Sequence, residues 1–152
     1  MNAVIAGDQL PQVQIRERIL RLEANLRQYE QLDLPLKHTF APGAYAREIL
    51  LPAGCIVVGK IHKHAHLNII SKGHVTVVTE FGMMEMRGVH TFTSQPGTKR
   101  ALIAHEDTIW TTIHLTNETD LEKIEDEIIA KSYDELPTQM IEQCLEVLEH
   151  KP

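Results

Sequence analysis

Hydrophobic positions divide the chain into a helical part, a β part and a second helical part. From about residue 11 to residue 32, apolar side chains recur at spacings of four, three, four and three, the period of one helix face. They are Ile15, Ile19, Leu22, Leu26 and Tyr29. The pattern predicts an amphipathic helix that ends before Pro35. Its apolar face either packs on its own domain or forms a contact between subunits, and the second alternative predicts a homo-oligomer.

Between about residues 40 and 115 the pattern is that of short β-strands separated by turns. The turn signals are Pro42-Gly43, Pro52-Ala53-Gly54, Lys72-Gly73, Phe81-Gly82, Arg87-Gly88, Pro96-Gly97 and Glu106-Asp107. A spacing of about 8–12 residues between such signals predicts an antiparallel sandwich or a small barrel, and not alternating strand–helix units. The expected fold is therefore mainly β, with a single barrel between helical ends.

After residue 117 the pattern becomes helical again. The run Thr119-Asp120-Leu121-Glu122 is typical of a helix N-terminus and precedes Ile124 and Ile128. A further helix is predicted to begin near Pro137. We therefore expect an N-terminal tail and helix in residues 1–39, a β-barrel in residues 40–116 and a C-terminal helical extension in residues 117–152.

Composition excludes several classes of protein. A chain of 152 residues with 43% hydrophobic and 24% charged residues has the make-up of one soluble globular domain. A net charge of −6 without a basic cluster argues against nucleic-acid binding, and no apolar run is long enough to span a membrane. Without a glycine-rich phosphate loop, no nucleotide cofactor is expected. Cys55 and Cys144 lie far apart and no leader-like segment precedes the first helix, so we expect a reduced, cytoplasmic setting.

Candidate chemistry is concentrated at His62, His64 and His66, which occupy every second position of a strand-like segment. In an unbroken strand the three side chains would share one face. Residues two apart are then separated by about 7 Å and residues four apart by about 13 Å, so one metal with bonds of about 2.1 Å does not reach all three. Two arrangements remain. Either residues 63–65 form a hairpin turn that places His62 opposite His66 with His64 at the tip, or neighbouring histidines pair with a ligand from elsewhere. The candidates for that further ligand are His90, His105 and His114.

The same segment resembles the first sequence motif of the cupin superfamily, whose members are jelly-roll β-barrels. That motif contains a glycine, a His-x-His pair, a glutamate and a second glycine. Here Gly54 precedes His62-Lys63-His64, and His66 occupies the glutamate position with six residues between it and Gly73. The resemblance covers about residues 40–115, and the chain looks most like small cupin-like proteins of tailed bacteriophages.

The second cupin motif is present with altered side chains. Gly88 leads to Pro96-Gly97, but Arg100 fills the position of the family's histidine and Ala104 that of its asparagine. A guanidinium does not ligate a metal, although it can hold a carboxylate or phosphate through two hydrogen bonds. The resemblance implies a site for at most one divalent metal (Zn, Ni, Mn or Fe) at His62, His64 and His66. The ligand-binding side chains that we expect beside it are Asn68, Arg100 and His114.

The function expected from these residues is that of a cupin-like protein that binds a small polar or anionic molecule, or a metal, inside the barrel. Two alternatives stay open. One is a metal-dependent cupin enzyme of the oxygenase or sugar isomerase/epimerase type, against which the missing second-motif histidine counts. The other is an oligomeric phage structural or host-interaction protein without catalysis; for a phage-encoded chain the compartment is the host cytoplasm. The sequence does not decide between enzyme and binding protein.

Overall fold

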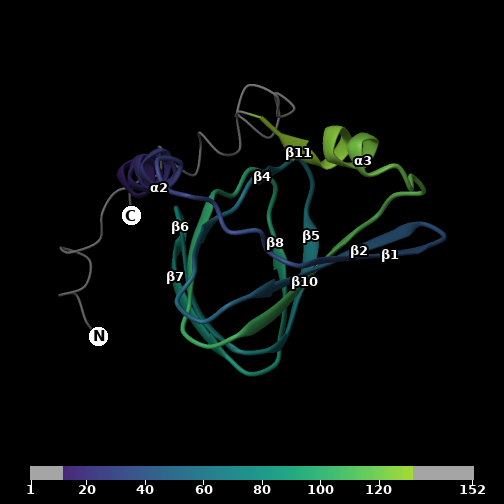
Figure 1. The fold of residues 1–152 in the computed structure, drawn as a ribbon. Helices are drawn as coiled ribbons and strands as arrows, with labels where there is room; N and C mark the ends of the chain where they lie inside the picture. Colours follow the sequence, from purple (N-terminus) through teal and green to yellow (C-terminus); the bar gives the residue numbers. More distant parts are fainter. Residues whose placement is uncertain (1–11, 132–152) are drawn as a thin grey trace, which may run out of the picture.

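The computed structural model describes residues 12–131, which form two facing antiparallel sheets that close into a barrel (Figure 1). The first sheet contains, in order, β1 (Leu36–Ala41), β2 (Ala44–Leu51), β10 (Thr108–His114), β5 (His66–Lys72) and β8 (His90–Ser94). The second contains β3 (Ile56–Val58), β9 (Arg100–Ala104), β6 (His74–Thr79) and β7 (Gly82–Arg87). This strand order is a jelly roll, so the predicted mainly β barrel of the cupin type is confirmed.

The predicted turns are the places where the chain reverses. Among the described residues, glycines with positive φ stand at six of them: Gly43, Gly54, Gly73, Gly82, Gly88 and Gly97. At Gly73, between β5 and β6, φ is +124° and an added Cβ would lie 2.1 Å from Thr108 Oγ1. This turn therefore requires a residue without a side chain. The first strand begins at Leu36, a little earlier than the sequence pattern predicts.

The barrel interior is apolar at one end and polar at the other. The apolar end is filled by the buried residues Leu51, Cys55, Ile70, Val75, Val77, Met86, Leu102, Ala104 and Trp110. The change to polar residues takes place along single strands, because inward-facing residues are two positions apart. On β5, Ile70 belongs to the apolar core, while Asn68 and His66 are buried nearer the other end. The sheets thus supply a rigid apolar base beneath the polar end of the interior, called the polar chamber below and formed by His62, His66, Asn68, Arg100 and His114.

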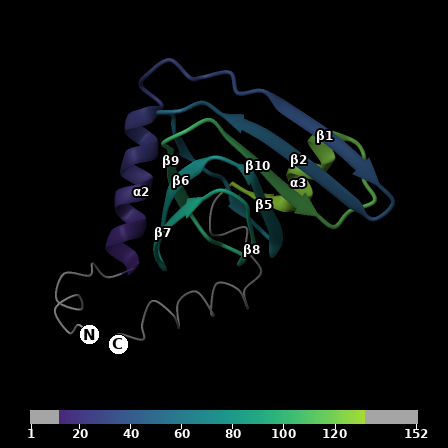
Figure 2. The same cartoon turned by 90° about the horizontal axis from the view of Figure 1, so that it is seen from below.

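Helix α2 (Gln12–Leu26) lies along the outside of the second sheet, where it contacts β3 and β6 (Figure 2). Ile19 is only 4% exposed, so the apolar stripe packs on the helix's own barrel. The helix is shorter than predicted, and Tyr29 lies beyond its end with 71% of its surface exposed. The subunit contact suggested for this helix stays a prediction.

The second predicted helix is α3 (Leu121–Ile128), and its N-cap, Asp120, lies within the predicted N-terminal run of residues 119–122. The Asp120 carboxylate accepts hydrogen bonds from the backbone N–H groups of Glu122 (3.0 Å) and Lys123 (3.3 Å). Neither α2 nor α3 has the length and apolar character needed to cross a bilayer.

Two short strands that the sequence pattern does not indicate connect α3 to the barrel. β11 (Ile129–Ala130) pairs with β4 (Ile61–His62) in a two-stranded antiparallel sheet. Figure 1 shows β11 and α3 over the end of the barrel where β4 lies. The helix predicted near Pro137, and Cys144 within it, lie outside the described residues.

Candidate functional site

Three histidines meet at the polar end of the barrel, and they are His62, His66 and His114. Their ring centroids are 4.2 Å apart for His62 and His66, 5.3 Å for His62 and His114, and 4.9 Å for His66 and His114. The chain leaves the strand conformation after His62 and resumes it at His66, so the unbroken-strand interpretation is wrong. His64 lies in the intervening turn and is exposed to solvent.

The turn at residues 63–65 agrees with the hairpin interpretation, but the predicted strand pairing does not. β4 pairs with β11 instead of β5. The His62 carbonyl also accepts a hydrogen bond from the Gly97 N–H at 3.0 Å, and the Lys63 N–H donates to the Ile128 carbonyl at 2.8 Å. The turn between β8 and β9 and the C-terminal end of α3 therefore position His62, and the turn at residues 63–65 alone does not.

The other candidate histidines are engaged elsewhere. His105 is exposed and forms a hydrogen bond with Thr76 Oγ1 at 2.7 Å. His90 bonds through Nε2 to the Arg87 carbonyl at 3.1 Å. Of the three further ligands that the sequence offered, His114 is the one that the structure brings to His62 and His66.

Asn68 and Arg100 lie beside the histidines in one hydrogen-bonded group. Asn68 is completely buried, and its Oδ1 accepts hydrogen bonds from Trp110 Nε1 (3.0 Å) and Arg100 Nη1 (3.4 Å). Its amide nitrogen donates to Ser94 Oγ at 2.8 Å. The Arg100 guanidinium carbon is 5.1 Å from the centroid of the Trp110 ring, within cation–π range. Arg100 is thus fixed in orientation while 9% of its surface remains exposed.

Burial and mutual repulsion keep the three imidazoles neutral. Burial lowers the pKa of His62 to about 2, assisted by the neighbouring His66, His114, Arg100 and Arg47. Burial, followed by the Arg100 charge, lowers the pKa of His66 to about 4. Burial, followed by His66, lowers the pKa of His114 to about 4 as well. Arg100 itself stays charged at neutral pH, because burial lowers its pKa only to about 10.

The charge of Arg100 is not neutralised by any ion pair within residues 12–131. A buried guanidinium without a carboxylate partner carries a desolvation cost of several kcal/mol. The chamber is therefore electropositive, which suits an anion.

The predicted metal set does not assemble in this arrangement. Neutral imidazole is the form that binds metals, and His66 Nε2 is buried without a hydrogen-bond partner, which favours a ligand of some kind. Within residues 12–131, however, no three side chains of His, Cys, Asp or Glu are placed to hold a metal ion. His64, one of the three predicted ligands, faces solvent. A divalent metal at His62, His64 and His66 therefore stays a prediction from the sequence.

Residues that the sequence reading missed also face this chamber. The clearest are Arg47 and Thr112, a Cα pair across β2 and β10. Thr112 Oγ1 lies 3.2 Å from His114 Nε2. The alternation of side chains along β2 could have identified Arg47. Tyr45 and Leu51 are an even number of residues away from Arg47 and are buried, so Arg47 lies on the same inward face. A charged residue on the inward face of a strand is an informative exception to the pattern.

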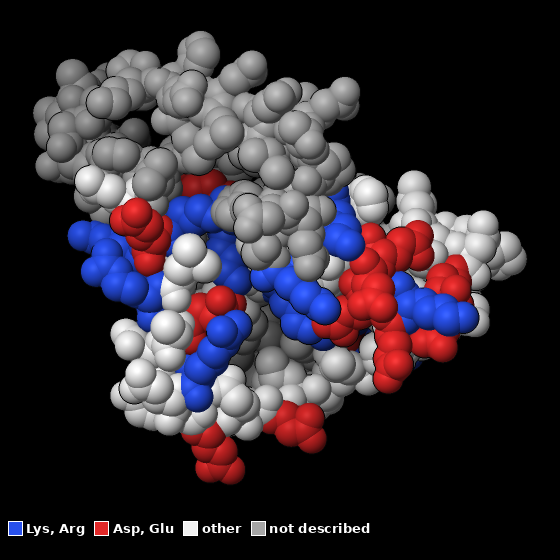
Figure 3. All heavy atoms as spheres, turned by 90° about the horizontal axis from the view of Figure 1, so that it is seen from above, with Lys and Arg blue, Asp and Glu red and all other residues white. Residues whose placement is uncertain are grey.

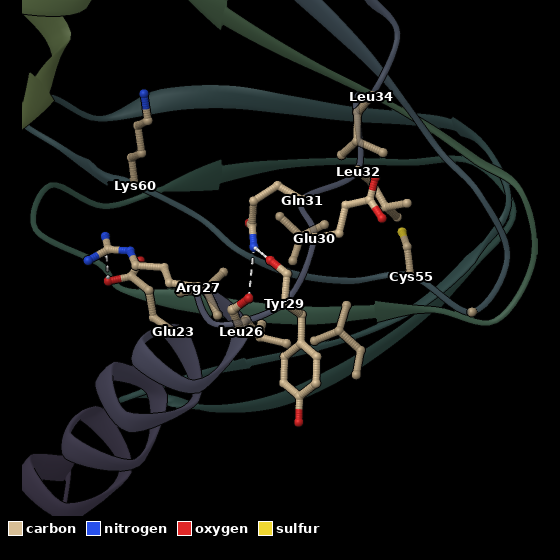
Figure 4. Close-up of a pocket in the computed structure, with 14 residues that line it drawn as sticks. Glu23, Leu26, Arg27, Tyr29, Glu30, Gln31, Leu32, Leu34, Cys55 and Lys60 are labelled. Carbon is tan, nitrogen blue, oxygen red and sulfur yellow. Dashed lines mark hydrogen bonds and ion pairs between the residues drawn. The ribbon is translucent and has the colours of Figure 1, made fainter.

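A separate cavity of about 490 Å³ lies between the C-terminal end of α2 and β3, away from the histidines (Figure 4). Figure 4 shows Glu23, Arg27 and Lys60 at one end and Leu32, Leu34 and Cys55 at the other. On the face drawn in Figure 3, lysine and arginine side chains are interspersed with aspartate and glutamate side chains. None of the predicted site residues lines the Figure 4 cavity.

Neither a protein-family model nor a curated protein sequence matches this chain. Solved structures do resemble it. Salicylate 1,2-dioxygenase from Pseudaminobacter salicylatoxidans superposes with a TM-score of 0.53 at 10% identity, over 74% of this chain and 35% of the dioxygenase. KdgF from Halomonas sp. gives a TM-score of 0.48 at 15% identity, over 62% of this chain and 91% of KdgF. A cupin superfamily protein from Desulfitobacterium hafniense gives 0.48 at 11% identity, over 60% and 85%. At such low identity the likeness to the dioxygenase is one of fold alone, and this chain spans about a third of that protein's length.

Proposed function

We propose that this protein binds a small anionic molecule in the polar chamber of its barrel, with Arg100 as the principal contact. The observation that carries the proposal is a nearly buried guanidinium that no carboxylate within residues 12–131 neutralises. An anion in front of Arg100 would offset the desolvation cost of the guanidinium. A neutral imidazole carries a single N–H, and those of His62 and His114 are available to the anion's remaining oxygen atoms, whereas His66 Nδ1–H faces the His64 carbonyl.

The chamber is also suited to holding such a ligand in one orientation. Asn68 and Trp110 fix the guanidinium from behind, so little side-chain entropy is lost when the ligand binds. The apolar core below excludes water from the base of the chamber. In this low-dielectric setting a charge-assisted hydrogen bond is stronger than at the surface.

The test is titration calorimetry with propionate and inorganic phosphate as probes. We expect both probes to bind to the wild type, and we expect Arg100→Met to lose measurable binding. Arg100→Lys keeps the charge but loses the planar fork, so it should bind at least about tenfold more weakly than the wild type. Arg87→Gln removes an exposed arginine that pairs with Glu106, and it should bind as the wild type does.

Circular dichroism of each variant establishes that it is folded. Binding by Arg100→Met that equals binding by the wild type would contradict the proposal, as would the absence of binding by the wild type. Elemental analysis of protein purified without a metal-affinity tag addresses the divalent metal, which stays a prediction from the sequence. The enzymatic, phage-related and host-interaction roles and the homo-oligomer are likewise predictions from the sequence.

A further inference from the structure

A second guanidinium faces the chamber from the side opposite Arg100. Arg47 on β2 is the Cα partner of Thr112 on β10, and Thr112 is the Cα partner of Asn68 on β5. Residues paired in this way across antiparallel strands point to the same face of the sheet. Arg47, Thr112 and Asn68 therefore form one row on the inner face.

The strand spacing gives the scale of this row. Two strand separations of about 4.8 Å place the Cα atoms of Arg47 and Asn68 about 10 Å apart. Arg100 donates to Asn68 at one end of the row, and Arg47 stands at the other. His114 follows two residues after Thr112 on β10, so the histidine rings lie close to the middle of the row.

Arg47 also opens onto a cavity of about 210 Å³ between the first sheet and α3. Tyr45 also lines this cavity; it is 3% exposed, and its ring centroid is 6.1 Å from that of His114. Arg47 is only partly buried, so its side chain is accessible from this cavity. Arg47 is thus more exposed to solvent than Arg100.

The charged groups around Arg47 leave it without an ion pair in the described part of the chain. Lys60 and Glu125 line the same cavity, but their charged groups pair with each other. The Arg47 charge acts on Tyr45, His62, His114 and Glu125. Tyr45 is in turn hydrogen bonded to His38, the Cα partner of Arg47 on β1, at 2.6 Å.

We propose that the ligand carries two anionic groups, one held by Arg100 in the chamber and the other by Arg47, with a short carbon chain passing the histidine rings. This inference rests on the proposed anion-binding function and narrows it to small dicarboxylates. A single carboxylate would neutralise Arg100 and leave Arg47 unpaired. A second carboxylate at the right separation would engage both arginines and gain affinity without a second loss of translational freedom.

The experiment compares succinate, glutarate and adipate with the monocarboxylates butyrate, pentanoate and hexanoate by calorimetry at pH 7.5 and constant ionic strength. We expect the best dicarboxylate to bind to the wild type at least about tenfold more tightly than the monocarboxylate of equal length. Arg47→Gln should remove this preference, because it should lower dicarboxylate affinity far more than monocarboxylate affinity. Arg87→Gln, the same substitution on a distant strand, should keep the preference. Arg47→Lys, which retains the charge, should keep part of it.

Equal affinity of the wild type for both series, or an undiminished preference in Arg47→Gln, would overturn the inference. In either case, monocarboxylate binding that disappears in Arg100→Met would leave the proposed function standing. If neither series binds to the wild type, both proposals fall together.

Discussion

Asn68 is a polar side chain with no exposed surface, and its neighbours explain why the barrel tolerates it. Both polar atoms of its amide have partners on three other strands, namely Ser94, Arg100 and Trp110. Satisfied in this way, a buried amide avoids the desolvation cost of an unpaired group. It also orients Arg100, so a residue at the boundary between core and chamber serves both stability and the site.

Gly73 is the single residue whose replacement should be least tolerated among the turn glycines. We expect Gly73→Ala to destabilise the fold by more than about 3 kcal/mol, because the new Cβ would meet the backbone of Thr108 and the residue would keep a positive φ. Gly82→Ala is the matched control: φ is +135° there, but no atom lies within 4 Å of the added Cβ. It should lose only about 1–2 kcal/mol. Urea unfolding of both variants measures the difference, and equal losses would contradict the steric argument.

Helix α2 is attached to the barrel by charged contacts as well as by Ile19. Lys99 Nζ binds Glu23 Oε2 at 2.6 Å, and the Lys99 backbone N–H donates to the buried Glu80 carboxylate at 3.1 Å. Burial raises the pKa of Glu80, while Arg16 acts in the opposite direction. Because Arg100 is the next residue after Lys99, this element of the fold also anchors the strand that carries the candidate anion contact.

The contact between Glu23 and Lys99 should be energetically significant, unlike an ordinary surface pair. Its side chains are 20% and 6% exposed, against 57% and 68% for Glu106 and Arg87. A double-mutant cycle with Glu23→Gln and Lys99→Met should give a coupling energy of about 1–3 kcal/mol. The cycle with Glu106→Gln and Arg87→Met should give about 0.5 kcal/mol or less. Similar coupling energies in the two cycles would show that burial does not strengthen the first pair.

At the scale of the whole molecule, the two sheets divide the barrel into a part that stabilises and a part that binds. The apolar cluster around Ile70, Val75 and Trp110 contains nine of the sixteen buried hydrophobic residues in the described part of the chain, and no histidine belongs to it. The polar chamber differs from this core, because its three neutral imidazoles make the stability of the fold sensitive to pH.

The stability of the fold should therefore decrease in mild acid. In the unfolded chain imidazoles titrate near pH 6.5, whereas the folded pKa is about 4 for His66 and His114 and about 2 for His62. Between these values the unfolded chain binds more protons, so the free energy of unfolding falls as the pH decreases from 6.5 toward 4. The His62 contribution continues toward pH 2. Each imidazole changes the free energy of unfolding by at most about 1.4 kcal/mol per pH unit. The three together change it by at most about 4 kcal/mol per pH unit.

Urea unfolding at pH 7.5, 6.5, 5.5 and 5.0 measures this dependence. His114→Gln should reduce the slope by up to about a third, since it removes one of the three titrating rings. The exposed His64→Gln should have the slope of the wild type. A slope in His114→Gln as steep as in the wild type would mean that this ring is not held neutral by the fold.

The sequence by itself determined the local features of this protein. Strand alternation, the glycine turns and the Asp120 cap are each readable within a few residues, because backbone sterics and local hydrogen bonds decide them. A turn at residues 63–65 was one of the two arrangements that the sequence left open for the histidine segment, and the structure has a break between strands there.

Only the tertiary structure decided which side chains meet. Period-two alternation states which face a residue occupies, but not which strand lies beside it. His114 reaches His66 because β10 is placed next to β5, and Arg47 faces the same chamber because β2 follows β10 in the sheet. The pairing of β4 with β11 depends in turn on α3 docking on Tyr45 through Ile124 and Ile128. These are long-range contacts, and their free energy comes from packing that no local segment of the chain contains.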